Sequence, residues 1–144
     1  MIDFSKWMKY VVRDDDRSLR HVFYRVTDFD IKNAKRILGH EFPPELDMFY
    51  KQVGYGFLCC DDNDSIDRIM DPLAVADVIS RSDFMKDDYR NKGLLPFFEL
   101  GDDIYITISM STGNIFYFNK KVANSLAEFL ENMDKETDYY SRVR

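Results

Sequence analysis

The amino-acid sequence predicts an α+β fold with a mainly antiparallel sheet, a helical N-terminal part and a closing C-terminal helix. Three observations lead to this prediction. Residues 27–54 carry two helical patterns joined by the pair Pro43-Pro44, residues 104–118 carry a strand–turn–strand pattern, and residues 125–133 carry a final helical pattern. Helices therefore lead the chain, the sheet occupies its middle, and a helix closes it.

Length and composition indicate one globular domain over residues 1–144. A chain of 144 residues can bury a core without disulfides or metals. Hydrophobic residues make up 45% of the chain and aromatic residues 15%, which excludes a disordered protein. The sequence has no apolar run of the roughly 18 residues that span a bilayer, and its N-terminus lacks a signal-peptide pattern. We therefore expect a cytoplasmic protein.

The net charge of −6 is unevenly distributed along the chain. Residues 1–40 carry 9 Lys/Arg and 6 Asp/Glu, whereas residues 41–144 carry 11 and 20. Nucleic acid and anionic membranes both need neutralising cations, so this acidic body disfavours them as partners. It suits a basic protein partner, and acidity that serves solubility alone explains it equally well.

The first forty residues predict a helix, a short strand and a second helix. Five apolar residues at helical spacing share one face, with Asp3 as the N-cap: Phe4, Trp7, Met8, Val11 and Val12. Residues 19–26 are β-prone and predict the strand. Thr27 or Asp28 caps the second helix, and Gly39 fits the left-handed position after its end. Its apolar stripe is Ile31, Ala34, Ile37 and Leu38.

The next segment, EFPPELDMFYKQVGYGF, predicts a tight corner and a third helix. Pro43 disfavours helix before it, and Pro44 suits the first helical position. Glu45 and Asp47 lie in the first turn, where the helix dipole favours negative charge. One buried face is formed by Leu46, Phe49, Tyr50 and Val53. Gly54 ends this helix, and a buried strand, GFLCC, follows it.

The second half of the chain predicts a helix, a sheet and the closing helix. Asp71-Pro72 opens a helix over 72–80, residues 82–93 are irregular, and residues 94–100 form a strand. Strict alternation over 104–110, the turn at 111–114 and residues 115–118 predict a hairpin. Ser125 and Glu128 form a capping box for the last helix. The tail, 135–144, has no clear period.

The sequence offers no pattern for catalysis, a metal or a cofactor. Cys59 and Cys60 are adjacent and predict two thiols in a buried strand. His21 and His40 lie in different segments without a metal-binding or nucleophile motif, which favours surface or capping roles. The acidic loop 61–67 fails the calcium-loop pattern at its sixth and twelfth positions. We therefore expect a protein that is not an enzyme and holds no cofactor.

The order of these motifs resembles the SUKH superfamily, which contains fungal glucan-synthesis and cell-wall assembly regulators and many bacterial relatives. The resemblance covers about residues 27–134. It rests first on the run from residue 30 to 56, then on LLPFFELGDDIYITISMSTGNIFYF and on ANSLAEFLENM. The positions that match the family framework motif are Leu38, Gly39, Pro43, Leu46, Phe49, Tyr50, Gly54 and Gly56, together with Ile31.

The resemblance implies a non-catalytic protein-binding domain. Bacterial members are regarded as immunity proteins that neutralise polymorphic toxins, often nucleases, and fungal members act in cell-wall synthesis. We therefore expect an immunity protein that binds a basic toxin domain; the alternative is a regulatory adaptor for glucan or cell-wall synthesis. The candidate partner-binding residues, all expected on loops beside the sheet, are Asp61, Asp62, Asp64, Asp67, Asp102 and Asp103.

Overall fold

The computed structural model describes residues 3–12, 19–60, 66–82 and 89–142. Its helices are η1 (Ser5–Tyr10), α1 (Asp28–Leu38), α2 (Pro44–Gln52), α3 (Pro72–Ser82), α4 (Tyr89–Lys92), α5 (Leu126–Lys135) and η2 (Tyr139–Arg142). Its strands are β1 (Val22–Tyr24), β2 (Tyr55–Phe57), β3 (Arg68–Ile69), β4 (Leu94–Gly101), β5 (Ile104–Ser109), β6 (Ile115–Tyr117) and β7 (Lys120–Ala123). The predicted α+β class is confirmed.

All the described strands belong to one sheet, in which spatial order follows chain order from β1 to β7. Each strand is antiparallel to the next, so the predicted antiparallel sheet is confirmed. The longest pairing joins β4 and β5, where Leu94 faces Ser109 and Gly101 faces Ile104. The sheet therefore runs as a meander whose longest strands are β4 and β5.

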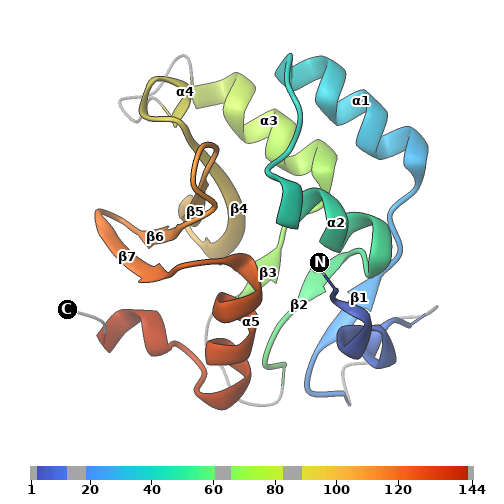
Figure 1. The fold of residues 1–144 in the computed structure, drawn as a ribbon, viewed down its shortest axis with the longest axis vertical. Helices are drawn as coiled ribbons and strands as arrows, with labels where there is room; N and C mark the ends of the chain where they lie inside the picture. Colours follow the sequence, from blue (N-terminus) through green and yellow to red (C-terminus); the bar gives the residue numbers. More distant parts are fainter. Residues whose placement is uncertain (1–2, 13–18, 61–65, 83–88, 143–144) are drawn as a thin grey trace.

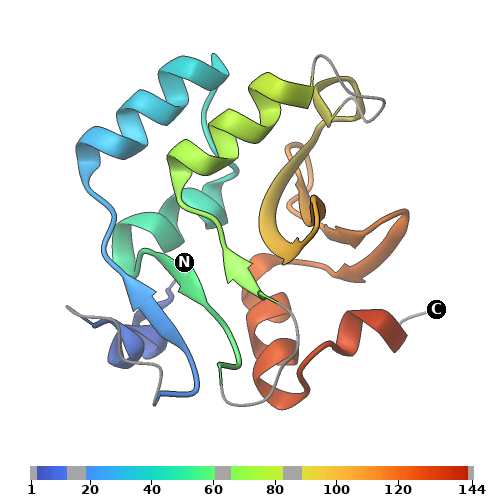
Figure 2. The ribbon, with the colours of Figure 1, turned by 180° about the vertical axis from the view of Figure 1, so that it is seen from behind.

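Helices cover the sheet at both ends of the molecule (Figures 1 and 2). Helices α1 and α3 lie side by side at one end, whereas α5 and η1 lie toward the other. The buried side chains of all these elements form one hydrophobic cluster. Phe129 of α5, for example, contacts both Phe97 and Phe98 of β4, with ring centroids 5.8 and 5.1 Å apart. An irregularity in the β4–β5 register at this point lets two neighbouring side chains reach one helix.

Local sequence signals set the bounds of α1 and α2. The Thr27 hydroxyl accepts a hydrogen bond from the Asp30 amide, which identifies Thr27 and not Asp28 as the N-cap. Gly39 ends α1 in the left-handed conformation, with φ of 81°. Pro44 then occupies the first position of α2. The predicted bounds of both helices are confirmed.

The framework residues before, at and after this corner pack α2 against the sheet. Leu38, Pro43, Leu46 and Phe49 are buried, and the buried Tyr50 hydroxyl donates to the Met70 carbonyl at 2.6 Å. A Cβ on Gly54 would overlap the Tyr24 carbonyl oxygen, and one on Gly56 would overlap that of Val22. Both glycines are therefore required by the close approach of β1, which adds to the predicted helix-ending role of Gly54.

The predicted N-terminal helix is wrong in type. The segment forms a 3₁₀ helix, whose period of about three residues aligns Phe4, Trp7 and Tyr10. Phe4 and Trp7 are buried, but Met8 is 48% exposed, contrary to the predicted α-helical face. Asp3 accepts from the Ser5 amide at 2.9 Å and does not cap the helix. Val11 pairs with Phe23 of β1 in an isolated bridge.

Other local predictions also need correction. Strand β2 ends at Phe57, so Cys59 and Cys60 lie in the loop that follows and not in a strand. The short elements β3, β7 and α4 were not predicted, and neither was η2 in the tail. The tail is held down by the Tyr139 hydroxyl, which donates to the Val122 carbonyl of β7 at 2.6 Å.

The first turn of α5 is bound by its own cap residue and by a side chain of α2. The Ser125 hydroxyl accepts from the Glu128 amide at 3.1 Å, which confirms half of the predicted capping box. The Glu128 carboxylate accepts from the Asn124 side-chain amide instead of completing the box. Glu45 of α2 accepts from the Leu126 and Ala127 amides at 3.3 and 3.2 Å. Glu45 therefore joins α2 to α5, a role its position in the sequence did not indicate.

Candidate functional site

The tight turn between β4 and β5 presents two adjacent aspartates to solvent. Gly101 pairs with Ile104, so Asp102 and Asp103 are the two central residues of the hairpin loop. Both are exposed and both have positive φ, 51° and 59°. Two left-handed residues in succession are typical of the type I′ turn, whose twist matches that of the strands. Asp tolerates this conformation better than most residues, so this turn holds two carboxylates at the tip of the hairpin.

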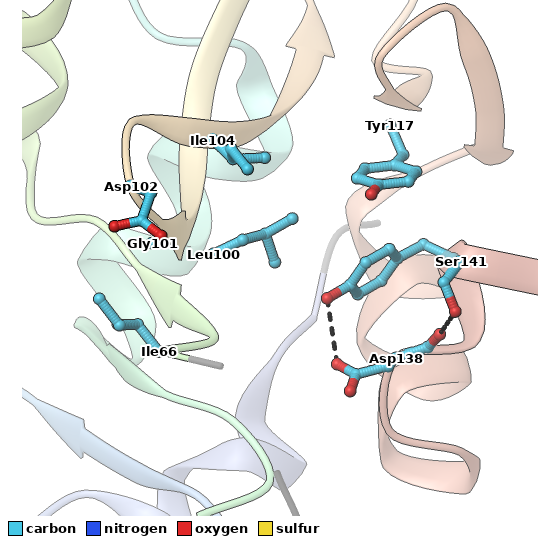
Figure 3. Close-up of a pocket in the computed structure, with 9 residues that line it drawn as sticks. Ile66, Leu100, Gly101, Asp102, Ile104, Tyr117, Asp138 and Ser141 are labelled. Carbon is cyan, nitrogen blue, oxygen red and sulfur yellow. Dashed lines mark hydrogen bonds between the residues drawn. The ribbon is translucent and has the colours of Figure 1, made fainter. Parts of the chain in front are cut away.

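Asp102 lines an open pocket of about 590 Å³, which we call the Tyr140 pocket. Figure 3 shows Ile66, Leu100 and Ile104 along one wall, with Asp102 beside Ile66. Tyr117, Asp138 and Ser141 lie along the opposite wall. The pocket thus lies between the β4–β5 turn and the C-terminal segment, which are distant in the sequence.

The polar groups of this pocket bind one another. The Tyr140 hydroxyl donates to Asp138 Oδ1 at 3.0 Å, and the Ser141 hydroxyl donates to the Asp138 carbonyl at 2.8 Å. Burial, and then the charges of Asp67 and Asp138, raise the pKa of Tyr140. Tyr140 therefore stays protonated at neutral pH and serves as a hydrogen-bond donor and not as a base. The pocket wall is preorganised, without an activated nucleophile.

Asp103 lines a second hollow of about 300 Å³, which we call the Thr107 groove. Tyr89, Lys92 and Leu94 come from α4 and the start of β4. Ile104, Tyr105 and Thr107 come from β5, and Phe118 and Asn119 from the β6–β7 turn. Ile104 lines both hollows. The two aspartates of one turn therefore line two neighbouring hollows, Asp102 the Tyr140 pocket and Asp103 the Thr107 groove.

Exposed apolar side chains gather around these hollows. Ile66 is 43% exposed, Ile104 38% and Phe118 64%, and each of them lines one hollow or both. Single exposed apolar residues need no explanation, but a group rimmed by carboxylates is typical of an interaction surface. We call this surface the turn face and define it by Ile66, Asp102, Asp103, Ile104, Tyr117, Phe118 and Asp138.

The predicted contact residues divide into three groups in the structure. Asp102 and Asp103 lie on the turn face. Asp61, Asp62 and Asp64 lie outside the described residues. Asp67 is fully buried next to β3, and its carbonyl accepts from the Leu58 amide at 2.8 Å. Asp67 therefore lies on a loop beside the sheet, as expected, but its buried side chain is not available to a partner in this structure.

Sequence reasoning missed the apolar and hydroxyl members of the site. Phe118 continues the aromatic pattern of 115–118, which predicted a core strand, but β6 ends at Tyr117 and leaves Phe118 in the turn. Ile104 belongs to the alternating β5 pattern, and its end position exposes it. No sequence signal marked Thr107 or Asp138, because the hollows that they line are assembled from distant segments.

In the part of the chain that the structure describes, His21 lies close to Cys59 and Asp134, but the geometry of this group argues against catalysis. His21 Nε2 lies 2.7 Å from Asp134 Oδ1, and Nδ1 accepts from the Cys59 amide at 3.0 Å. The predicted surface or capping role of His21 is wrong, because its side chain is fully buried. The Cys59 thiol faces the Met133 carbonyl, and burial is the main cause that raises its pKa to about 11. The thiol is therefore protonated and inert at neutral pH.

The structure offers no metal-binding cluster and no membrane span in the segments it describes. Among those residues, no group of three or more His, Cys, Asp or Glu is placed to hold a metal ion. No helix formed by them is long and apolar enough to cross a bilayer. His40, by contrast with His21, is exposed, and its Nδ1 lies 2.9 Å from the Glu41 carbonyl.

Comparison with known proteins gives two matches. The SMI1 / KNR4 family (SUKH-1) matches residues 25–132. A Bacillus subtilis (strain 168) protein called immunity protein YxxD is 33% identical over 129 residues, which cover 82% of this chain and 86% of the relative. No solved structure matches the chain significantly. The family match includes the framework region and every residue of the turn face except Asp138.

Proposed function

Because the chain belongs to the SMI1 / KNR4 family (SUKH-1), we propose that it is a cytoplasmic immunity protein that binds and occludes a basic toxin domain. The toxin class that fits this proposal best is a nuclease, since nucleases carry cations for their own substrate. The protein neutralises its partner by binding and performs no catalysis. The similarity to an immunity protein favours this role over the alternative of a cell-wall regulatory adaptor.

The turn face is the observation that carries the proposal. It combines exposed apolar side chains with Asp102, Asp103 and Asp138 around two hollows. Apolar and aromatic anchors in pockets supply most of the free energy of a protein interface. Carboxylates at the rim speed encounter with a basic partner and discriminate against acidic ones. The face therefore has the two components that tight, selective binding of a cationic protein requires.

The test combines co-purification with protection of cells. The protein is co-expressed with the product of a toxin gene adjacent to its own, and toxin capture and cell survival are measured. We expect the wild type to capture the toxin and to protect the cells. The variant Asp102→Asn/Asp103→Asn should bind at least about tenfold more weakly at low salt, because two rim charges are lost while Asn keeps the left-handed turn.

A matched control separates this face from general acidity. The variant Asp28→Asn/Glu41→Gln also removes two exposed charges, but from α1 and the segment before α2. It should bind as tightly as the wild type to within about twofold. Equal weakening by both pairs would contradict the assignment of the turn face, and absence of any protection by the wild type would contradict the immunity role itself.

A further inference from the structure

The charge of Asp103 is compensated within the chain itself. The Tyr105 hydroxyl donates to Asp103 Oδ1 at 3.3 Å, and Arg81 Nε of α3 lies 3.2 Å from Asp77 Oδ2. A hydrogen bond to Tyr105, and then the charges of Asp77 and Asp103, raise the pKa of Arg81, so its guanidinium lies close to all three groups. Lys92 lines the same groove. Asp103 therefore has a cation of its own chain beside it.

Asp102, on the other side of the same turn, has no such cation. No ion pair between described residues includes Asp102 or Asp138. Both carboxylates line the Tyr140 pocket, and none of the described residues that line this pocket is basic. A cleft lined by charge of one sign concentrates the electric field and attracts ions of the opposite sign. The two hollows of the turn face therefore differ in charge balance.

Both walls of the Tyr140 pocket are held in place by contacts within the chain (Figure 3). On one side, the Ile66 amide donates to the Leu100 carbonyl at 3.3 Å. On the other side, the Tyr140 ring packs on Tyr117 with centroids 4.9 Å apart, and its hydroxyl holds Asp138. The pocket thus needs little ordering when a partner binds, which favours affinity.

The lining of the pocket defines the chemistry of its occupant. Ile66, Leu100 and Ile104 can cover an aliphatic stem, and the face of an aromatic ring such as Tyr117 attracts a cation. Ionised carboxylates only accept hydrogen bonds, so the occupant must donate them. An apolar or acidic side chain would leave the carboxylates without a counter-charge. The occupant therefore needs an aliphatic stem that ends in a cation.

We propose that the Tyr140 pocket, and not the Thr107 groove, receives a cationic side chain of the bound toxin, and that Asp102 and Asp138 are the carboxylates that contact it. The inference rests on the proposed function and deepens it, because it makes the two aspartates of one turn unequal. Asp102 recognises the partner, whereas Asp103 is compensated by Arg81. Lysine and arginine both have the required stem and charge.

The first experiment needs no toxin and uses N-acetyl-L-lysine methylamide and its arginine counterpart as probes. Backbone amide NMR spectra of the full chain are recorded as each probe is added. We expect shifts at Gly101, Asp102 and Ser141, with a dissociation constant on the order of 10 mM, as for a single anchoring side chain. Leu94 and Asn119, which line only the Thr107 groove, should not shift. The uncharged norleucine derivative should bind at least about fivefold more weakly.

Three single variants then compare the carboxylates in binding of the toxin. Asp102→Asn and Asp138→Asn should each weaken binding at least about fivefold at low salt, because each removes a charge from the pocket. Asp103→Asn is the matched control and should bind like the wild type to within about twofold, because Arg81 already compensates this charge. The three positions have φ of 51°, 62° and 59°, which Asn tolerates. Tm should therefore change by less than about 3 °C in each variant.

Arg81→Gln tests the compensation directly. Removal of this cation leaves the Asp103 charge unopposed, so the variant should bind a basic toxin about two- to threefold more tightly at low salt. The gain should disappear at high salt, where exposed charges are screened. Weaker binding by Arg81→Gln would contradict the role given to Arg81.

The outcomes distinguish this inference from the immunity role. Equal losses from Asp102→Asn and Asp103→Asn, no probe shifts at the pocket, or equal binding of the norleucine derivative would overturn the inference, while capture of the toxin by the wild type would still support the immunity role. Binding of the cationic probes at the pocket without capture of any toxin would support the cation site and contradict the immunity role.

Discussion

His21 lies between two groups that fix its protonation state. Nδ1 accepts from the Cys59 amide, so it carries no proton, and Nε2 must then donate to Asp134. Aromatic rings surround the imidazole, with centroids of Tyr10 and Trp7 at 4.8 and 5.5 Å. A neutral histidine therefore joins β1, the loop after β2 and the end of α5.

Asp134 gives this cluster a predictable pH dependence. Burial raises the pKa of Asp134, but hydrogen bonds from His21 and Arg20, together with the charge of Arg20, outweigh burial and lower the pKa below its ordinary value. A carboxyl whose pKa is lower in the folded than in the unfolded chain stabilises the fold above the unfolded pKa, near 4. That contribution is lost as the pH falls through the folded-state pKa.

The measurement compares free energies of unfolding of the wild type and Asp134→Asn between pH 7 and pH 3. We expect the wild type to be the more stable at pH 7, and the difference to shrink steadily below about pH 4. A difference that stays constant down to pH 3 would show that the Asp134 charge does not stabilise the fold.

The surface or capping role predicted for His21 was wrong because its contacts are made with residues distant in the sequence. Its two partners lie 38 and 113 residues away along the chain. Local sequence contains no information on such pairings, so burial of a lone histidine could not be deduced. Thr107 is similar. The alternating pattern of residues 104–110 placed Thr107 on the face of the strand opposite Ile106 and Ile108, but it could not indicate the groove beside it. The position of Asp102 and Asp103 in a loop was predictable, because a Gly-Asp-Asp turn between two strands is a local signal.

At the scale of elements, Glu45 connects two helices that flank the sheet. It belongs to the first turn of α2, and its carboxylate accepts from the first two amides of α5. These amides lack partners within their own helix, and an acceptor there also satisfies the positive end of the helix dipole. Glu45 and Ser125 therefore cap the N-terminus of α5 jointly.

Removal of this contact should destabilise the protein measurably. We expect Glu45→Ala to lower the free energy of unfolding by about 1–2 kcal/mol, since capping bonds contribute about 1 kcal/mol and bonds to charged acceptors somewhat more. Urea denaturation measures the change. Glu41→Ala is the control, because Glu41 is exposed and pairs only with Lys35 in the described ion pairs, so it should change stability by less than about 0.5 kcal/mol. Equal effects would contradict the α2–α5 role.

Helices and strands with strong local sequence signals were predictable. Short strands that form only because they pair with a neighbouring strand were not. Thr27 and Gly39 mark both ends of α1 because capping is a property of the nearest few residues. Strand β7 begins with Lys120-Lys121 and is a strand only because it pairs with β6. The N-terminal segment was misassigned because Phe4 and Trp7 fit a period of 3.0 as well as one of 3.6.

At the scale of the whole molecule, the turn face is assembled from four segments of the chain. Ile66 precedes β3, Asp102 to Ile104 join β4 and β5, Phe118 follows β6, and Asp138 precedes η2. The fold class could be predicted from the order of helical and alternating patterns. The turn face could not, because it depends on where the strands of the meander and the C-terminal segment lie in space. The acidic balance of residues 41–144 led to the prediction of Asp102 and Asp103 as contact residues, but it could not show the apolar residues beside them.

The central claim is that a basic toxin domain covers the turn face, and hydrogen exchange of the complex tests it most directly. Exchange of backbone amides is measured by mass spectrometry for the chain alone and with the toxin encoded by the adjacent gene. We predict that protection on binding concentrates in residues 101–107 and 117–120, while α1, which lies elsewhere, is unchanged. Protection confined to α1 and α3, with residues 101–107 unchanged, would contradict the account.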